Sequence, residues 1–255
     1  MQLQTLFAQI DSKQAELARR RPLSAAEAAS LREYLDLEWT YNSNAIEGST
    51  LTRQETLVVL KHGLTVGGKP LVEHLEAINH QMAIDFVERL AEDPEPPTLD
   101  DILAIHALVL RSIDEGHAGQ FRSGQVYITG SVYVPPPGAA VPGRMTEFAD
   151  WLLRTGVSMT AGGGLHPVER AAHAHFWLVD IHPFVDGNGR VARLLLNLLL
   201  MQVGYPIAII RNEDRAAYYA ALESGHDGRL DDFLVFVAKA VDRTADILLS
   251  ATGDG

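Results

Sequence analysis

The spacing of apolar residues along the chain predicts helices through most of its length. Leu31, Leu35 and Trp39 recur every four residues, which is the period of one face of a helix. A capping box, Ser24-Ala-Ala-Glu27, precedes this stripe, and Gly48 after it suits the left-handed conformation that ends helices. The pattern therefore predicts a helix that begins after Ser24 and ends near Gly48.

Other boundary signals predict further helices and one linker. A second capping box at 52–55 opens a helix that stops at Gly63, and 71–90 has the pattern of a long helix. Thr98 caps a helix from Leu99 to about Arg111, and Pro167 opens one that runs toward Asp180. The run Asp-Pro-Glu-Pro-Pro at 93–97 is incompatible with a helix. We therefore predict an all-α fold, a helical bundle, with an N-terminal helical region at 1–95 and a core at 96–250.

One stretch departs from the helical pattern. Residues 126–134, Val-Tyr-Ile-Thr-Gly-Ser-Val-Tyr-Val, are rich in β-branched and aromatic types around a central glycine, which predicts a short β-hairpin. Three prolines at 135–137 end it. Because an isolated hairpin cannot build a sheet, it is either a surface loop or a flap beside a functional site.

Composition and charge exclude several classes of protein. The 255 residues include 21 basic and 33 acidic side chains and no cysteine, so the net charge is −12 and neither a disulfide scaffold nor a cysteine-zinc site can form. The excess of acid argues against general nucleic-acid binding. The most apolar stretch, 191–203, is interrupted by Arg193 and is too short for a membrane span, so it predicts a buried core helix. Since the N-terminus lacks signal-peptide features, we expect a soluble, cytoplasmic protein.

The segment between the Pro167 helix and this core helix contains the candidate chemistry. Gly187-Asn188-Gly189 lies ahead of a helix N-terminus, where backbone N–H groups and the helix dipole together form a cradle for an anion. Arg190 and Arg193 are three apart and share a helical face, an arrangement that suits a polyphosphate.

Two further residues of this segment add metal-binding and acid–base functions. Asp186 adjoins the cradle, and a carboxylate there would repel phosphate unless a cation such as Mg²⁺ lay between them. His182 has the pKa range to take a proton from an attacking hydroxyl. Each feature alone has a simpler explanation as a turn, a helix cap or a solvated charge. Together they predict a phosphoryl- or nucleotidyl-transfer site.

The run His-Pro-Phe-Val-Asp-Gly-Asn-Gly-Arg-Val-Ala-Arg at 182–193 closely resembles the Fic signature, His-x-Phe-x-Asp/Glu-Gly-Asn-Gly-Arg-x-x-Arg, and every specified position matches. The likeness extends over roughly 43–237, including Gly-Gln-Phe-Arg at 119–122, His166-Pro167 and His175. Fic proteins are mostly helical, and most transfer AMP from ATP to a hydroxyl of a target protein with release of pyrophosphate. The resemblance therefore implies a protein adenylyltransferase that uses ATP and Mg²⁺.

The resemblance also implies a role for each matched position. His182 matches the base, Asp186 the Mg²⁺ ligand, and Phe184 an anchor of the loop in the core. The nucleotide positions are the anion hole, Gly187, Asn188 and Gly189, the arginines for the outer phosphates, Arg190 and Arg193, and the adenine side, Tyr218 and Tyr219. His226 stands where the family often has Asn. The hairpin matches a flap that docks the target by strand addition through Val126, Tyr127, Ile128, Thr129 and Gly130.

An upstream segment resembles a control element of the same family. Ser43 and Glu47 are four apart, and Glu47 falls in the last turn of its helix, where the dipole disfavours a carboxylate. Alone, it would be a surface glutamate before a glycine cap. Beside the signature, Ser-Asn-Ala-Ile-Glu-Gly at 43–48 resembles the inhibitory motif Ser/Thr-x-x-x-Glu-Gly/Asn, whose Glu pairs with the second signature arginine, here Arg193. The resemblance implies an autoinhibited enzyme with an inhibitory helix around 40–48.

Several alternatives stay open at this level. Phosphoryl transfer is disfavoured because the Doc branch has Lys where this chain has Gly189. Phosphocholine transfer, removal of AMP from a modified protein, and a non-enzymatic nucleotide sensor remain. A histidine metal site at His173, His175 and His182 is disfavoured because His173 and His175 point to different helical faces. Self-modification and pairing into a homodimer are further expectations, although no apolar stripe marks a dimer interface.

Overall fold

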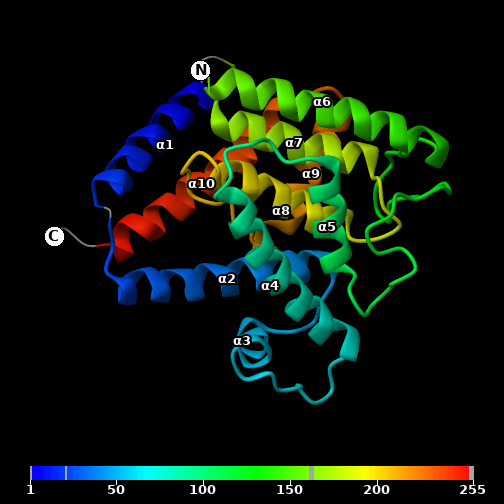
Figure 1. Ribbon diagram of the computed structural model, residues 1–255, viewed down its shortest axis with the longest axis horizontal. Helices are drawn as coiled ribbons and strands as arrows, with labels where there is room; N and C mark the ends of the chain where they lie inside the picture. The colour runs from blue at the N-terminus through cyan, green and yellow to red at the C-terminus, as the bar shows by residue number, and fades with distance from the viewer. Residues whose placement is uncertain (1, 21, 161–163, 253–255) are drawn as a thin grey trace.

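The computed structural model describes residues 2–20, 22–160 and 164–252, and this part of the chain is almost entirely helical (Figure 1). The predicted all-α class is confirmed. The α-helices are α1 Gln2–Arg19, α2 Ala25–Glu47, α3 Arg53–His62, α4 Leu71–Ala91, α5 Leu99–Val109, α6 Val141–Thr160, α7 Pro167–Ile181, α8 Asn188–Met201, α9 Arg215–His226 and α10 Asp231–Ala251. Two short 3₁₀ turns, η1 Gly138–Ala140 and η2 Asn212–Asp214, precede α6 and α9.

The predicted helix boundaries agree with the structure to within about two residues. The Ser24 hydroxyl accepts a hydrogen bond from the Glu27 N–H at 3.3 Å, and the Glu27 carboxylate accepts the Ser24 N–H at 3.0 Å. Thr52 caps α3 in the same way. Gly48 ends α2 with φ +109°, a conformation that only glycine adopts readily. Local capping chemistry therefore determines where these helices begin and end.

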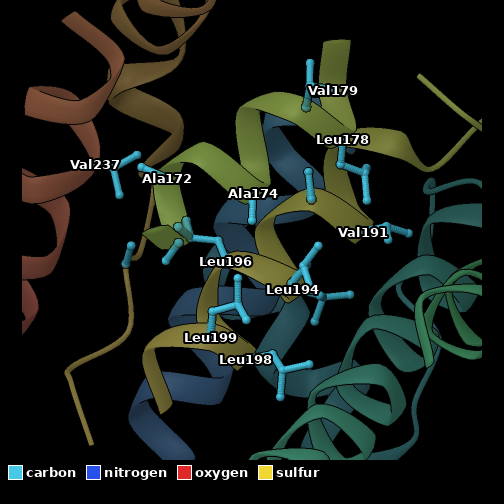
Figure 2. Close-up of a cluster of buried hydrophobic side chains, with 14 of the residues drawn as sticks. Ala172, Ala174, Leu178, Val179, Val191, Leu194, Leu196, Leu198, Leu199 and Val237 are labelled. Atoms are coloured by element: carbon cyan, nitrogen blue, oxygen red, sulfur yellow. The ribbon is translucent and has the colours of Figure 1, made fainter. Parts of the chain in front are cut away.

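Helix α8 lies at the centre of the molecule, packed between α7, α4, α5 and α2. Its leucines are fully buried and meet side chains of α7 and α10 (Figure 2). The buried amide in the middle of this apolar helix, Asn197, accepts the Ala208 N–H at 2.7 Å and donates to the Ala208 carbonyl at 3.3 Å. Because α8 is held on several sides, its N-terminal end is a rigid platform for the loop that precedes it.

Helix α1 packs along α10 and joins the two ends of the described chain, as seen in Figure 1. Lys13 of α1 forms ion pairs with Asp242 at 2.7 Å and Asp246 at 2.6 Å. Helices α2, α3 and α4 also pack against one another. Within the described residues, no helix is both long and apolar enough to cross a membrane.

The segment predicted as a β-hairpin does turn back on itself, but it forms no strands. Gly130 has φ +84°, and the Ser131 N–H donates to the Ile128 carbonyl at 3.1 Å, which closes the turn. The Gln125 amide donates to the Pro135 carbonyl at 3.1 Å and holds the base of the loop together. No ladder of backbone hydrogen bonds joins its two arms, since a two-stranded ribbon without a third strand gains too little to form one.

Candidate active site

The candidate site is the loop that joins α7 to α8. His182 caps the end of α7 in the left-handed conformation, with φ +49°, and Gly187 precedes α8 as its N-cap, with φ +79°. The sequence pattern predicts that Asn188 and Gly189 lie in the loop ahead of this helix. The structure corrects this, because α8 starts at Asn188 and both residues belong to its first turn. Their N–H groups are among those that a helix leaves unpaired at its N-terminus, and they face the loop.

The side chain of Asn188 bridges the loop internally, a role that the sequence pattern does not indicate. The Asn188 amide oxygen accepts the Phe184 N–H at 2.9 Å, and its nitrogen donates to the Phe184 carbonyl at 3.0 Å. Asn188 and Phe184 are both buried. This reciprocal pair fixes the distance between the start of α8 and the middle of the loop.

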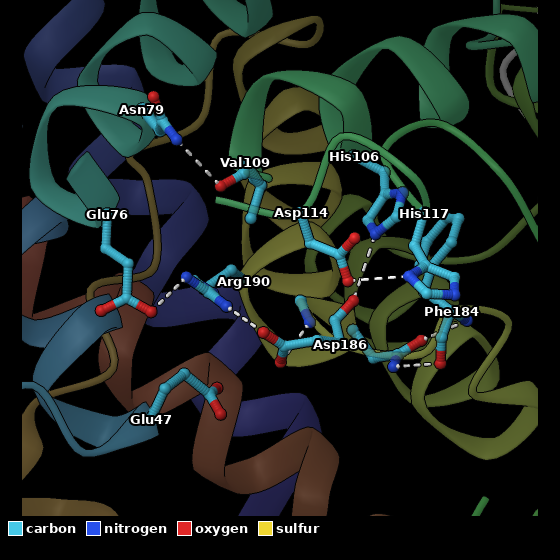
Figure 3. Close-up of polar contacts among 12 residues, drawn as sticks. Glu47, Glu76, Asn79, His106, Val109, Asp114, His117, Phe184, Asp186 and Arg190 are labelled. Atoms are coloured by element: carbon cyan, nitrogen blue, oxygen red, sulfur yellow. Dashed lines mark hydrogen bonds and ion pairs between the residues drawn. The ribbon is translucent and has the colours of Figure 1, made fainter. Parts of the chain in front are cut away.

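Helix α5 supports the loop through the side chain of His106. Its ring stacks on Phe184 with centroids 3.7 Å apart. The Gly119 N–H donates to His106 Nδ1 at 3.0 Å, so Nε2 carries the proton and donates to the Asp186 carbonyl at 3.1 Å. Burial lowers the pKa of His106 to about 4, which keeps the ring in this neutral form. Phe184 is therefore anchored in the core, and His106 ties the anchor to Asp186 (Figure 3).

Arg122 clamps the other end of the loop. Its buried guanidinium donates to three carbonyl oxygens at 2.7 Å, those of His182, Gly124 and Pro136, and the Arg122 N–H donates to the Pro183 carbonyl at 2.9 Å. One side chain thus joins the His182 end of the loop to the base of the 126–134 segment.

Replacing Arg122 by methionine should lower the free energy of unfolding by about 3 kcal/mol, because buried carbonyl groups would lose charged donors. Urea denaturation measures this loss. The matched control is Arg154→Met, since Arg154 is an exposed arginine of α6. Equal losses in the two variants would show that the Arg122 hydrogen bonds add nothing to the free energy of unfolding beyond what an exposed arginine contributes.

The side chain of His182 faces a small cavity of about 100 Å³. Glu47, Gly189, Tyr218 and Tyr219 line the same cavity, as do Ile128, Ser131, Val179, Leu222, Glu223 and His226. Burial lowers the pKa of His182 to about 4, so its ring is neutral at pH 7 and can accept a proton. This cavity is smaller than the roughly 300–1,000 Å³ of typical small-ligand pockets.

Arg190 lies between two carboxylates, as Figure 3 shows. It is buried and donates to Glu76 of α4 at 2.9 Å and to Asp186 at 3.0 Å, and its Nε has no partner within the described part of the chain. The Asp186 carboxylate is largely exposed and also accepts the Gly187 N–H at 2.6 Å. Arg190 and Asp186 would therefore have to exchange partners if either were to meet a phosphate or a metal ion.

Arg193 is held by the last two turns of α2. Its side chain is 2% exposed and donates to the Glu47 carboxylate at 2.7 Å, to the Ser43 hydroxyl at 3.0 Å and to the Ser43 carbonyl at 2.8 Å. A buried guanidinium without a carboxylate partner would be costly, so Glu47 neutralises a charge that α8 places in the core.

The Glu47 carboxylate also lies over the N-terminus of α8. A methyl group on Gly189 would collide with Glu47 Oε1 and come within 3.1 Å of the Arg193 guanidinium. The carboxylate thus occupies the space in front of the unpaired N–H groups of α8, where an anion is stabilised by the helix dipole. Any other anion entering the cradle would compete with Glu47.

The two tyrosines of α9 form the wall opposite the loop. The buried Tyr218 shares a hydrogen bond of 3.0 Å with Nε2 of His175, whose pKa burial lowers to about 3. Tyr219 lies beneath Arg215, which donates to the Ile46 carbonyl at 2.8 Å. Helix α9 therefore contacts both the cavity and the last turn of α2.

Of the predicted flap residues at 126–130, one lines the cavity. Ile128 lines it, whereas Tyr127 is 77% exposed. The neighbouring Ser131 hydrogen-bonds to Glu223 of α9, and Tyr133 stacks on His226 with centroids 3.7 Å apart. These contacts hold the flap segment, which includes Val126, Thr129 and Gly130, against the α9 side of the site.

The described residues contain no group of three or more His, Cys, Asp or Glu side chains that could hold a metal ion. His175 is committed to Tyr218, and His173 lies 4.0 Å from Glu169 on its own helix. Asp186 offers hard carboxylate oxygens at the exposed mouth of the site, which suits Mg²⁺ bound together with phosphate oxygens.

Several residues that shape the site could not be assigned a role from the sequence. Glu76, His106, Arg122 and Arg215 act from other helices or loops, and each meets its partner only in the folded chain. Arg122 was recognisable as part of the 119–122 resemblance, but its function as a clamp was not. No local pattern marks Glu76, because it looks like any glutamate on a helix.

Comparison with known proteins defines the family. Residues 96–200 match the model of the Fic/DOC family. A solved structure of Fic-1, residues 134–508, from C. elegans is 33% identical, and the alignment covers 98% of this chain and 72% of that one with a TM-score of 0.87. The chain belongs to the Fic/DOC family.

The curated relatives that match this chain are named as adenylyltransferases. The chain is 42% identical over 213 residues to Protein adenylyltransferase Fic of Nematostella vectensis, covering 83% of this chain and 48% of the relative. It is 37% identical over 248 residues to Protein adenylyltransferase Fic of Drosophila willistoni, and this alignment covers 97% of this chain and 48% of that relative. The chain thus spans about half the length of these curated relatives. A Fic domain containing signaling protein from Bacteroides thetaiotaomicron is 28% identical with a TM-score of 0.87, covering 98% of this chain and all of that one.

Proposed function

We propose that this chain is a protein adenylyltransferase, which transfers AMP from ATP to a Tyr, Thr or Ser hydroxyl of a target protein. The observation that carries the proposal is the meeting of a neutral histidine, His182, with the N-terminus of α8 in one cavity. The adenylyltransferase names of the relatives support the same activity.

Each group would have a defined part in the transfer. The target hydroxyl oxygen attacks the α-phosphorus, the bond from that phosphorus to the bridging oxygen breaks, and pyrophosphate leaves. His182 takes the hydroxyl proton. The N–H groups at Gly187, Asn188 and Gly189 stabilise the negative charge on the phosphate oxygens, and Arg190 and Arg193 bind the outer phosphates. Tyr218 and Tyr219 form the adenine side.

Asp186 would hold Mg²⁺ against the phosphates, because its carboxylate is exposed and adjoins the cradle. When bound, the ion would neutralise charge on the phosphate oxygens. Asp186 would then release Arg190, whose freed guanidinium could turn toward the outer phosphates while Glu76 keeps it oriented.

We further propose that Glu47 inhibits the enzyme. Its carboxylate holds Arg193 and lies in front of the N-terminus of α8, the two features that would bind the outer phosphates. A nucleotide that enters must displace the carboxylate or bind with its phosphates misplaced. The small volume of the cavity supports the same conclusion.

The target would lie along the 126–134 flap, where Tyr127 and Val132 are 77% and 91% exposed. An extended segment could pair with the backbone of the flap by strand addition, which would place its hydroxyl near His182. Incubation of the Glu47→Gly variant with ATP, Mg²⁺ and host lysate, followed by mass spectrometry, tests the proposal. A gain of AMP on Ser, Thr or Tyr supports it; a gain of phosphate or phosphocholine, or ATP binding without any product, contradicts it.

Removal of AMP from a modified protein is a second candidate activity. The Glu47 side chain is 32% exposed and shares the cavity with His182, so its carboxylate could orient a water toward a phosphorus bound there. Incubating the modified target with wild-type protein and with Glu47→Gln separates the two activities, because removal would need the carboxylate and transfer would not.

The pH profile of the reaction should reflect the buried position of His182. A base works only while it is neutral, so activity falls as pH drops through its pKa. Burial lowers the pKa of His182 to about 4 although the nearby Glu47 charge raises it, so kcat/KM for ATP in the Glu47→Gly variant should hold steady down to about pH 5 and fall only at or below about pH 4. An ordinary histidine would give this fall near pH 6.5. Parallel measurements of ATP binding correct for titration of the nucleotide.

We also propose that the protein modifies itself and that two copies pair into a homodimer. Apolar side chains at the start of α4 and in the preceding loop are exposed, including Leu71 at 66% and Leu64 at 58%. Exposed apolar groups of this size favour burial against a partner. Light scattering of the purified protein measures whether a dimer forms, and labelled ATP measures self-modification.

A further inference from the structure

The two halves of α2 are packed very differently. Most residues from 25 to 35 are exposed, and grooves of about 440 and 660 Å³ flank this half of the helix. From Trp39 onward nearly every residue is buried or half-buried. The end of the helix that carries Glu47 is therefore held mainly by the close packing from Trp39 to Glu47, while the outer half adds surface ion pairs such as those of Arg32 with Asp85 and Glu88 of α4.

One of these contacts is a buried hydrogen bond between α2 and α4. It joins the Thr40 hydroxyl to Nδ1 of His80 at 3.2 Å, and both residues are at most 1% exposed. Thr40 lies seven residues before Glu47 and three before Ser43, so the three share one face of α2. The bond thus fixes the face of α2 that presents Ser43 and Glu47 to Arg193.

Helix α4 also holds the other side of the site. Glu76 lies one turn before His80 and forms the 2.9 Å ion pair with Arg190. Two successive turns of α4 therefore contact α8 and α2. Because α4 is the common support, the position of Glu47 relative to α8 depends on the bond at His80.

The environment of His80 is unfavourable for a residue that serves packing alone. Its Nε2 is buried and has no hydrogen-bond partner among the residues that the structure describes. Burial, together with the nearby positive charges of Arg193 and Arg190, lowers the pKa of the ring well below its usual value. An apolar side chain would fill this position without an unpaired nitrogen. What His80 adds beyond packing is its bond to Thr40 and an edge contact with the Trp39 ring of the same helix, with centroids 6.0 Å apart.

We propose that His80 is a positioning residue for the inhibitory helix, which keeps Glu47 seated on Arg193 through its hydrogen bond to Thr40. This inference rests on the proposed function, in which a seated Glu47 blocks the nucleotide. Loss of the bond releases the last two turns of α2 and raises the fraction of molecules whose cradle is open.

Thr40→Val and His80→Met test the proposal, since both keep the approximate volume and remove the hydrogen bond. Labelling with ATP should rise about fivefold in each, the effect of one net hydrogen bond, and by no more than that when both are combined. In the Glu47→Gly background neither should raise labelling, because no carboxylate remains to be seated. A destabilised fold would lower labelling in both backgrounds, so this difference separates positioning from a purely structural role.

Hydrogen exchange of the α2 amides supplies a readout that does not depend on catalysis. Exchange at 40–47 should quicken about fivefold in both variants, whereas exchange in α10 should not change. The matched control is Thr244→Val, which removes a buried threonine hydroxyl that donates to the Ala240 carbonyl of its own helix at 3.2 Å. Unchanged α2 exchange in both test variants would overturn the inference, even if Glu47→Gly proved inactive and the proposed function failed separately. Equal gains in labelling with and without Glu47 would overturn it as well.

Discussion

Replacing Glu47 by glycine should raise AMP transfer on the order of tenfold to a hundredfold. The carboxylate holds Arg193 at 2.7 Å and occupies the space in front of α8, so its removal frees both features for the outer phosphates of ATP. The size of the gain follows from the 1–3 kcal/mol that such couplings typically carry. Labelling with ATP and Mg²⁺, on the protein itself or on a target, measures it.

Thermal stability gives a second result for the same variant. Without Glu47 the buried Arg193 loses its carboxylate partner and keeps neutral ones such as Ser43, so the melting temperature should fall. ATP should then raise it more than in the wild type, because the nucleotide supplies the missing negative charge. Glu33→Gly is the matched control, since Glu33 is an exposed glutamate of the same helix that pairs with Lys61. If labelling in Glu47→Gly stays at the wild-type level, Glu47 is not inhibitory.

The second large effect is expected at His182. In the Glu47→Gly background, His182→Ala should lower transfer by a factor on the order of 10²–10⁴, the usual contribution of a general base. ATP affinity should change little, because the anion cradle and both arginines remain. Labelling rates and calorimetric ATP titrations measure the two quantities separately.

A suitable control for this variant is His117→Ala. His117 is exposed and bonded to Asp114, and in Figure 3 it lies close to the loop without belonging to it. Its removal should leave the rate of transfer unchanged. Transfer that survives in His182→Ala at the parent rate would assign the base to another residue.

Much of the fold could be predicted from local chemistry. The caps at Ser24, Thr52 and Thr98 act within four residues of themselves, so their patterns predict where α2, α3 and α5 begin. The hairpin prediction is the instructive exception. The residues of 126–134 favour strands and form the expected turn at Gly130, but strand formation depends on a pairing partner that this segment lacks. The division of the chain at 95 and 96 stays a prediction.

The candidate site also has one part that the sequence predicts and one part that it does not. The run at 182–193 is contiguous, so the residue types and their spacing are enough to indicate an anion cradle and a base. Its supports are not contiguous. Glu76, His106 and Arg122 precede their partners by 114, 80 and 60 residues, and no local pattern relates members of such pairs.

The sequence by itself determined which chemistry this chain can carry, because cradle, base and arginines lie within twelve residues and their types have fixed chemical properties. Only the tertiary structure decided whether the cradle is open or covered. Packing of α2 and α4 against α8 brings Glu47 onto Arg193 across 146 residues and buries His80 behind it. Burial and distance between remote groups arise only when the chain folds, and they set the pKa of His182 and the occupancy of the cradle.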